Sequence, residues 1–248
     1  MTVHSEPARR TVTRTGHDDD SRRRNLLEMR GRDWATAHGI RTPSTVDSDG
    51  DGSLLVSEYV PSLSSSGANY VEAALALAGM VSAAPEPSFG ISASGWRAPR
   101  TSLLTRAARL CAAGVDPVVF VRARRRVARI PSQVTVHGDF HVGNVLNLGD
   151  GVVCLLDFEH AGRGPRHADA LRLVTTLDRT SDAEYGLELL LRAATRDDRG
   201  TIADQLEWLA LRHLADLVTG RVSRSRVDAA HARWHLARHW ARDIRNML

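Results

Sequence analysis

Residues 134–160, VTVHGDFHVGNVLNLGDGVVCLLDFEH, restrict the possible folds more than any other part of the chain. The apolar runs VTV, VLNL and VVCLL indicate short strands, and the last two flank a GDG turn. Asp-Gly between apolar runs is a strong short-range signal for a β-hairpin. If the hairpin folds about Asp150, Asn144 lies opposite Leu156, and Asp157 is the next residue. The pattern therefore predicts that Asn144 and Asp157 leave the same end of the hairpin as neighbours.

The polar side chains at this strand end suit phosphate chemistry. Asp139 lies in the loop before the hairpin, so two carboxylates and one amide oxygen gather there. Mg²⁺ prefers oxygen ligands and shares its coordination with substrate phosphates. Kinase-like phosphoryl transfer uses one loop Asp that accepts a hydroxyl proton, with an Asn and a second Asp on the metal. Asp139 is thus a candidate proton acceptor, and Asn144 and Asp157 are candidate metal ligands.

The string HGDFHVGNVL followed by LLDFE resembles the signature of the aminoglycoside phosphotransferase and choline kinase-like families, which are relatives of the protein kinases. The family pattern is His-Gly-Asp-x-His-x-x-Asn and, one hairpin later, Asp-Phe/Trp-Glu. All eight positions match, from His137 to Glu159. The resemblance covers roughly residues 10–245 and is strongest from 134 to 172. It implies that His137 braces the catalytic loop and that Glu159 supports the metal ligands without binding the metal itself. It also implies that Asp169 lies at the start of a helix and supports the loop.

The resemblance implies an α+β, protein kinase-like fold with two lobes. A shortened N-terminal lobe, residues 1–61, is expected as strand, helix and hairpin, with residues 1–10 frayed and a hinge near 57–60. A large, mainly helical lobe, residues 62–248, is expected to carry the catalytic loop 137–144 and the metal-binding segment 157–159. The nucleotide base is expected to meet the hinge at Glu58 and Val60.

The chain departs from the family in its nucleotide-binding lobe. Family members use a strand Lys, paired with a helix Glu, to hold the phosphates, but all 33 basic residues here are Arg. Glu28 fits the helix Glu, and Arg14 falls near the Lys position, although a planar guanidinium is not interchangeable with an ammonium. The Gly-rich nucleotide loop is also missing, since Gly16 is the first glycine. Three explanations stay open: a start further upstream, a minimal lobe that relies on metal and hinge, or ligand binding without catalysis. The clustered carboxylates favour catalysis, because burying such charges costs stability.

Two other metal sites are conceivable. His137 and His141 have the spacing of a helical zinc pair, but the neighbouring glycines favour a loop. Residues 47–58, DSDGDGSLLVSE, match the calcium-loop template. An EF-hand needs a helix on each side, whereas the flanking glycine and prolines indicate strand, turn and strand.

Composition indicates which partners and which cellular compartment to expect. The formal net charge of +4 is modest, and nucleic acid is not expected as a partner. The best basic run, Arg122 to Arg129, is expected to be a solvated helix face. Cys111 and Cys154 lie in apolar contexts and suggest buried thiols in a reducing compartment. There is no visible signal peptide and no apolar run of membrane-spanning length, so a cytoplasmic protein that does not enter a membrane is expected.

The last helix, from Val227, has apolar residues at three- and four-residue spacing. We expect it to pack within the large lobe, and a homodimer through this face stays an alternative.

These features together predict a Mg²⁺-dependent phosphotransferase that moves the terminal phosphoryl group of ATP or GTP to a hydroxyl of a small molecule or biosynthetic peptide. A nucleotide-binding pseudokinase or regulatory binding protein is the alternative. The helices after Asp169 carry many carboxylates, but residues 221–248 contain seven Arg and two Asp. This balance favours a neutral or weakly charged acceptor over a polycation, with the loop 86–99, including Phe89 and Trp96, as a possible cover.

Overall fold

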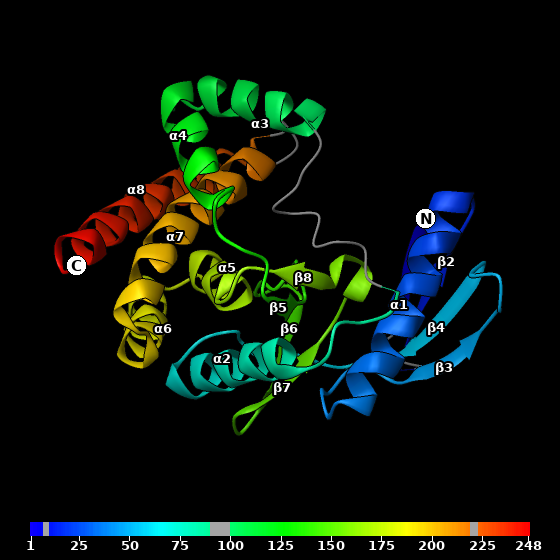
Figure 1. Cartoon of the computed structure of the whole chain (residues 1–248). Coiled ribbons are helices and arrows are strands. Elements are labelled where there is room, and N and C mark those ends of the chain that lie inside the picture. Colours follow the sequence, from blue (N-terminus) through cyan, green and yellow to red (C-terminus); the bar gives the residue numbers. More distant parts are fainter. Residues whose placement is uncertain (7–9, 90–99, 219–222) are drawn as a thin grey trace.

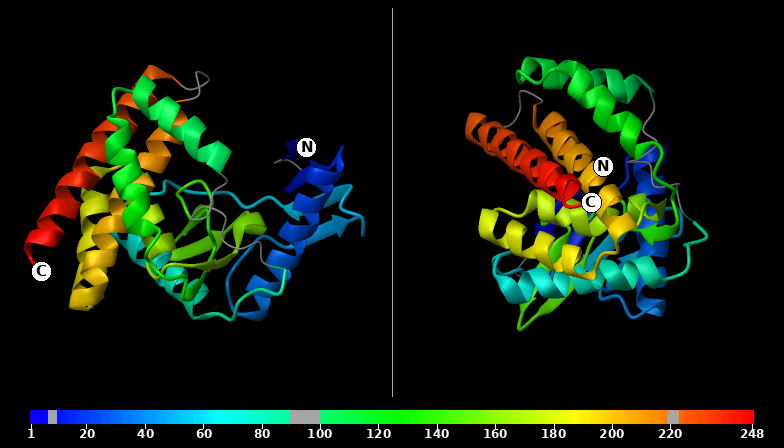
Figure 2. Two further views of the ribbon diagram at one scale, coloured as in Figure 1. Left: turned by 45° about the horizontal axis from the view of Figure 1, so that its top comes forward. Right: turned by 60° about the vertical axis from the view of Figure 1, so that its left-hand side comes forward.

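The computed structural model describes residues 1–6, 10–89, 100–218 and 223–248, and Trp96 lies outside them. An N-terminal antiparallel sheet with one long helix forms one side of the molecule, and a mainly helical part forms the other (Figure 1). Figure 2 shows the same division from two further directions. The α+β class, with an N-terminal sheet followed by a helical part, is confirmed.

The N-terminal sheet has four strands in the order β1-β2-β4-β3, all antiparallel. They are β1 (Thr2–Glu6), β2 (Thr11–Thr15), β3 (Thr45–Ser48) and β4 (Leu54–Glu58). The expectation of a frayed N-terminus is therefore wrong for β1. Its side chains from Thr2 to Ser5 are exposed, so its place depends on backbone pairing with β2, which leaves no hydrophobic pattern to detect.

Helix α1 (Asp19–Ala37) connects β2 to β3 and carries its own start signal. The Asp18 side chain accepts a hydrogen bond from the Ser21 N–H at 2.7 Å, and the Ser21 hydroxyl accepts one from the Asp18 N–H at 3.1 Å. This reciprocal capping, with Asp19 and Asp20 in the first turn, stabilises the positive end of the helix. Because Gly31 has no side chain, α1 approaches Phe158 so closely that a Cβ would lie 2.1 Å from the Phe158 Cβ.

The described helical part also contains two short strand pairs and one 3-10 turn. Its helices are α2 (Ala68–Ala83), α3 (Arg100–Ala112), α4 (Pro117–Val127), α5 (Ala168–Thr176), α6 (Thr180–Ala193), α7 (Arg196–Leu217) and α8 (Arg224–Asn246). Its strands are β5 (Val134–Val136), β6 (Val145–Gly149), β7 (Val152–Leu155) and β8 (Gly162–Gly164), with a 3-10 turn η2 (Phe158–His160). Strands β5 and β8 pair, as do β6 and β7.

The β6–β7 hairpin has the register that the sequence predicts. Val145 pairs with Leu155, and the Leu156 N–H donates to the Asn144 carbonyl at 2.8 Å. Asn144 and Asp157 therefore leave the hairpin at the same end. The 47–58 segment also forms two antiparallel strands joined by a turn. There Asp51 and Asp49 accept hydrogen bonds from Ser53, and strands flank the turn where an EF-hand needs helices.

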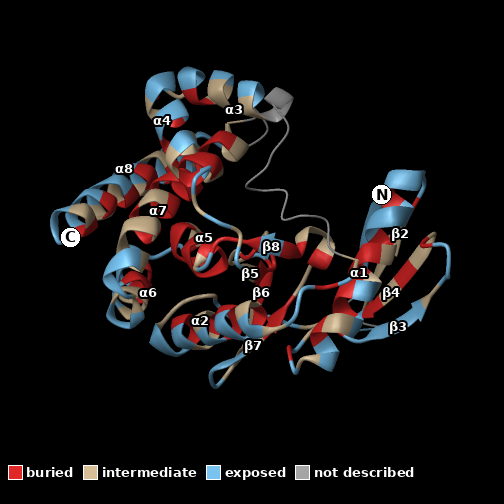
Figure 3. Ribbon diagram, viewed as in Figure 1, coloured by how far each residue is buried: buried red, intermediate tan, exposed pale blue. Residues whose placement is uncertain are grey.

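The core of the helical part surrounds α7, which Figure 3 shows buried along much of its length. Helix α8 buries its apolar face within this lobe, and this face comprises Ala230, Trp234, Ala237, Ala241 and Ile244. This explains the periodicity of the last helix without a second chain.

The expectation of a solvated face holds for Arg122, Arg125 and Arg129, which are exposed, but not for the whole run. The 122–129 run is not only a solvated face, because Arg124 lies over the Trp208 ring at 5.9 Å and Arg126 bonds Glu207 at 2.5 Å. The expectation of a buried thiol is wrong for Cys111, which is exposed, whereas Cys154 is buried as expected. No helix among the described residues is long and apolar enough to cross a membrane.

Gly31 and Gly79 provide a matched test of how closely α1 packs against Phe158 of the helical part. Gly31→Ala should destabilise the protein by about 1–3 kcal/mol, because the added methyl overpacks against Phe158. Gly79→Ala, at an exposed position of α2 with open space around it, should stabilise by about 0.5–1 kcal/mol. Urea unfolding measures both. Equal stabilisation by the two changes would show that α1 does not contact Phe158.

Candidate active site

The loop 137–144 follows β5 and is fixed by one buried carboxylate. Asp169, in the first turn of α5, accepts hydrogen bonds from the His137 N–H at 2.6 Å and the Gly138 N–H at 3.1 Å. Gly138 has φ of +83°, and a Cβ there would lie 2.4 Å from the His160 carbonyl oxygen. Only glycine fits this approach, so α5 and η2 together determine where the loop begins.

His137 lies beneath this loop and is 1% exposed. Its Nε2 donates to the Leu156 carbonyl at 2.8 Å, and its ring contacts Phe140 and Phe158 edge-on. Burial lowers the pKa of His137, so the ring is neutral. The contacts suit a brace between the loop and the residue before Asp157. The helical zinc pair is excluded because His137 and His141 lie in a loop and not on a helix.

Asp139 is held by donors from three directions. Its carboxylate lies 3.3 Å from Arg172 Nη2, 3.4 Å from His141 Nε2 and 3.4 Å from Asn144 Nδ2. Burial acts to raise the pKa of Asp139, but the His141 hydrogen bond and the Arg172 charge outweigh it and lower that pKa. The carboxylate is therefore ionised at neutral pH and can accept a hydrogen bond from a hydroxyl.

Asn144 is 9% exposed and points its amide nitrogen at Asp139. Besides the carboxylate, Nδ2 donates to the Asp139 backbone carbonyl at 3.0 Å. This contact uses the amide N–H group and leaves Oδ1 as the atom that can ligate a cation.

Asp157 lies between β7 and η2 in a left-handed conformation, with φ of +64°. Such backbone is uncommon outside glycine and often occurs at functional sites. Burial and the charge of Glu28 raise the pKa of Asp157 to about 6, despite Arg14 Nη1 at 3.7 Å. The charge of Arg14 therefore does not offset the combined effect of burial and the neighbouring carboxylates on Asp157.

This donor set fits a magnesium ion that is shared with phosphates. Asn144 Oδ1 and the Asp157 carboxylate are hard oxygen ligands, and Mg²⁺ commonly takes one or two protein carboxylates and completes its shell with water and phosphate. The described residues contain no group of three or more His, Cys, Asp or Glu side chains that could hold a metal without such help.

Glu28 is fully buried and joins the two parts of the molecule. Its Oε2 accepts from the Phe158 N–H at 2.6 Å, and its Oε1 accepts from Arg32 Nε at 2.8 Å. Arg32 continues to the Ser57 hydroxyl on β4 at 2.7 Å. Burial acts to raise the pKa of Glu28, but the charges of Arg32 and Arg14 lower it, so the group is ionised. Glu28 thus contacts the turn beside Asp157, whereas Arg14 contacts Asp157 itself.

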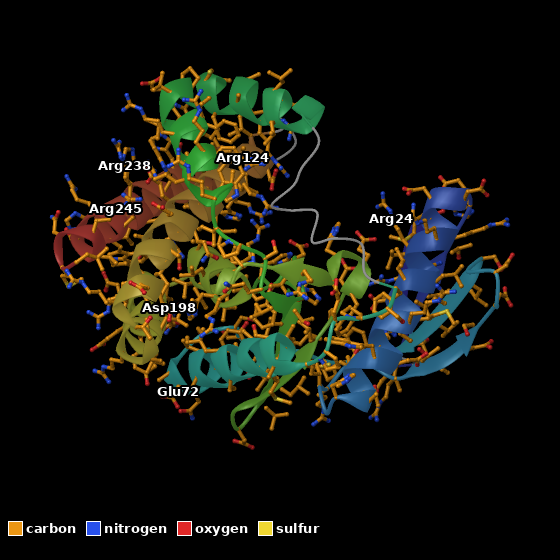
Figure 4. All side chains as sticks on the ribbon, in the orientation of Figure 1. Arg24, Glu72, Arg124, Asp198, Arg238 and Arg245 are labelled. Atoms are coloured by element: carbon orange, nitrogen blue, oxygen red, sulfur yellow. The ribbon has the colours of Figure 1, made fainter. Side chains whose placement is uncertain are left out.

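The remaining expected residues are Glu159, Glu58 and Val60. Glu159 is 3.8 Å from Arg24 of α1, which Figure 4 labels, and 3.3 Å from His160. Glu58 ends β4, and its carboxylate accepts from the Ser44 hydroxyl at 3.0 Å, away from the Asp157 cluster. Val60, just beyond β4, makes no backbone hydrogen bond from its N–H to another described residue.

Sequence reasoning missed Arg172 and Arg32. Both follow a proposed site residue on the same helical face, three residues after Asp169 and four after Glu28. Residues at these spacings are neighbours on a helix, so helical periodicity provided a signal for both.

A model of the phosphotransferase enzyme family matches residues 2–204. No curated protein matches the chain.

Three solved structures share the fold. A choline/ethanolamine kinase family protein from Mesorhizobium loti has 16% identity and a TM-score of 0.58, covering 93% of this chain and 82% of its own. An aminoglycoside phosphotransferase from Alicyclobacillus acidocaldarius has 16% identity and a TM-score of 0.58, covering 100% and 92%. An amicoumacin kinase in complex with AMP-PNP and Ca²⁺ has 14% identity and a TM-score of 0.56, covering 94% and 81%.

At these identities the solved structures show the fold alone, whereas the family model spans most of the chain. The resemblance carried by the loop and hairpin motifs is confirmed, and the protein belongs to the phosphotransferase enzyme family.

Proposed function

We propose that the protein transfers the terminal phosphoryl group of ATP or GTP to a hydroxyl of a small molecule or biosynthetic peptide, with Mg²⁺ as the cofactor. The arrangement of Asp139, Asn144 and Asp157 carries the proposal. One loop and one hairpin bring together an ionised carboxylate, an amide oxygen and a second carboxylate. A hydroxyl acceptor, a cation and the nucleotide phosphates require these three groups.

Asp139 orients the acceptor hydroxyl and takes its proton. Its low pKa makes it a weak base, so positioning is its larger contribution, in keeping with a phosphoryl transfer that needs little covalent help. Arg172 and Asn144 hold the carboxylate in place on either side. His137 positions the loop and does not touch substrate.

Asn144 and Asp157 hold Mg²⁺, which neutralises the charge of the nucleotide phosphates. Arg14 lies 3.7 Å from Asp157 and supplies a positive charge on the phosphate side. Glu28 acts through Phe158, because it fixes the turn that presents Asp157. The amicoumacin kinase holds AMP-PNP and Ca²⁺, which supports a nucleotide with a divalent cation in this fold.

The base of the nucleotide is placed at the hinge after β4. Glu58 and Val60 would face it through their backbone, and the Val60 N–H is a candidate donor. The acceptors named for the structural neighbours differ from one another, so they support a hydroxyl acceptor in general and select none.

Asp139→Asn tests the role of the loop carboxylate. Because a positioned base typically contributes about 10²–10⁴ in rate, kcat should fall by that factor while nucleotide affinity stays near the wild-type value. The acceptor for this assay is first identified by mass spectrometry, as the compound of a biosynthetic extract that becomes phosphorylated on incubation with protein and nucleotide. Asp150→Asn, the same change at the exposed hairpin tip, should leave kcat unchanged. Loss of nucleotide affinity with kcat retained would show that Asp139 serves the nucleotide instead. Nucleotide binding by the wild type without any phosphorylated product would favour the pseudokinase alternative.

Asp157→Asn should abolish turnover without lowering stability. The folded-state pKa of Asp157 is raised to about 6, so its ionised form costs folding free energy at neutral pH. Asparagine removes that charge at nearly constant volume. The thermal unfolding temperature, measured without Mg²⁺, should equal or exceed that of the wild type. Turnover at the wild-type rate would exclude Asp157 as a metal ligand.

A further inference from the structure

A cavity of about 370 Å³ lies in the helical part, between the end of the loop 137–144 and helices α5, α7 and α8. His141 and Arg172, which both contact the Asp139 carboxylate, also line this cavity. Its far wall comes from α8, with Arg226 and Arg233. A ligand in the cavity can therefore place a hydroxyl at Asp139 and a second group at α8.

The lining carries more positive than negative charge. It contains three arginines, Arg172, Arg226 and Arg233, and a single carboxylate among its described residues, that of the exposed Asp178. Arg233 Nη2 donates to the backbone carbonyl of Asp178 at 3.0 Å. Because that acceptor is neutral, only the nearby charge of the exposed Asp178 carboxylate partly offsets the guanidinium charge.

Two of these three guanidinium groups have buried donors without an acceptor. Arg233 Nη1 and both Nε and Nη1 of Arg172 are buried and make no hydrogen bond to another described residue. Unpaired buried donors are costly. An anion in the cavity stabilises these groups through their positive charge, and the guanidinium fork matches carboxylate and phosphate oxygens.

The residues behind this wall do not offset the charge. Arg212 is 7% exposed, and burial, together with the charges of Arg172 and Arg106, lowers its pKa to about 9. His213 lines the cavity, and burial followed by the charge of Arg172 lowers its pKa to about 4, so it is neutral. The nearby Asp216 is paired with Arg106 at 3.1 Å.

Of the described carboxylates that follow Asp169 in the sequence, only that of Asp178 lines the cavity. Asp182 accepts from the Gly67 N–H, while Asp204 and Glu207 pair with Arg126 and Arg245. The acidic wall that would attract a polycation is thus absent from the described lining.

We propose that the acceptor is an alcohol that also carries an anionic group, a carboxylate, phosphate or sulfate, bound against Arg226 and Arg233 while its hydroxyl reaches Asp139. This inference rests on the proposed function. It replaces the neutral or weakly charged acceptor that the sequence favours with an anionic one, and it disfavours polycationic acceptors through direct repulsion.

Calorimetric titration with simple anions tests the cavity without knowledge of the acceptor. Inorganic sulfate and acetate are the probes, and saturating Mg²⁺ and AMP-PNP cover the nucleotide phosphate site. The test variant is Arg226→Gln with Arg233→Gln. The control is Arg238→Gln with Arg242→Gln, the same charge change on the same helix, in a separate groove of about 540 Å³ beside α4. Figure 4 labels Arg238 on α8, on the side of the molecule remote from α1.

At least one anion should bind the wild type, and the test variant should weaken it about tenfold or more, as expected for the loss of charge-assisted hydrogen bonds. The control should bind like the wild type, and unfolding temperatures should show that both variants fold. Stronger binding of sulfate indicates a phosphate or sulfate ester, and stronger binding of acetate indicates a carboxylate.

Binding of neither anion, or a loss that follows the control pair, overturns the inference. Failure of the proposed function is distinguishable, because it appears as a lack of Mg²⁺·AMP-PNP binding. Sulfate and acetate titrated without nucleotide would then still report on the cavity.

Discussion

The hydrogen bond from the Phe158 N–H to Glu28, 2.6 Å long, connects the two parts of the molecule at the point where the chemistry is proposed. A fully buried carboxylate is tolerated only when it is paired and hydrogen-bonded. Glu28 meets this condition through Arg32, which reaches β4 at Ser57, and through Phe158. The position of Asp157 therefore depends on α1 and β4 as well as on its own hairpin. The close approach of Gly31 to Phe158 allows this geometry.

A chain without Lys must manage phosphate charge in another way. Arg14 occupies the expected strand but lies beside Asp157 and does not pair directly with Glu28. A guanidinium 3.7 Å from the carboxylate only partly offsets the surrounding negative charge, since the pKa of Asp157 remains raised. Under the proposed function, most of the phosphate binding is therefore due to a cation at Asn144 and Asp157, and Arg14 is a secondary contact.

The parts of the site that could be predicted are those that local sequence determines. The Asp-Gly turn fixes the hairpin register, and that register brings Asn144 next to Asp157. Contacts between distant segments could not be read in this way. The Glu28 bond to Phe158 joins residues 130 positions apart, and β1 is held by backbone pairing without a hydrophobic pattern. The charge of the acceptor cavity is a further case. A count of carboxylates and arginines along the helices favours a neutral or weakly charged acceptor, but it cannot assign a charge to the cavity, because only the fold determines which side chains face the same space.

Calorimetric titration of ATP and GTP, with and without Mg²⁺, tests the central claim most directly. We expect the donor nucleotide, whether ATP or GTP, to bind weakly and in a strongly Mg²⁺-dependent way. We also expect Asp157→Asn to abolish the Mg²⁺-dependent part while the protein stays folded. Equally tight binding without the metal, or Mg²⁺-dependent binding that survives in Asp157→Asn, would contradict this claim.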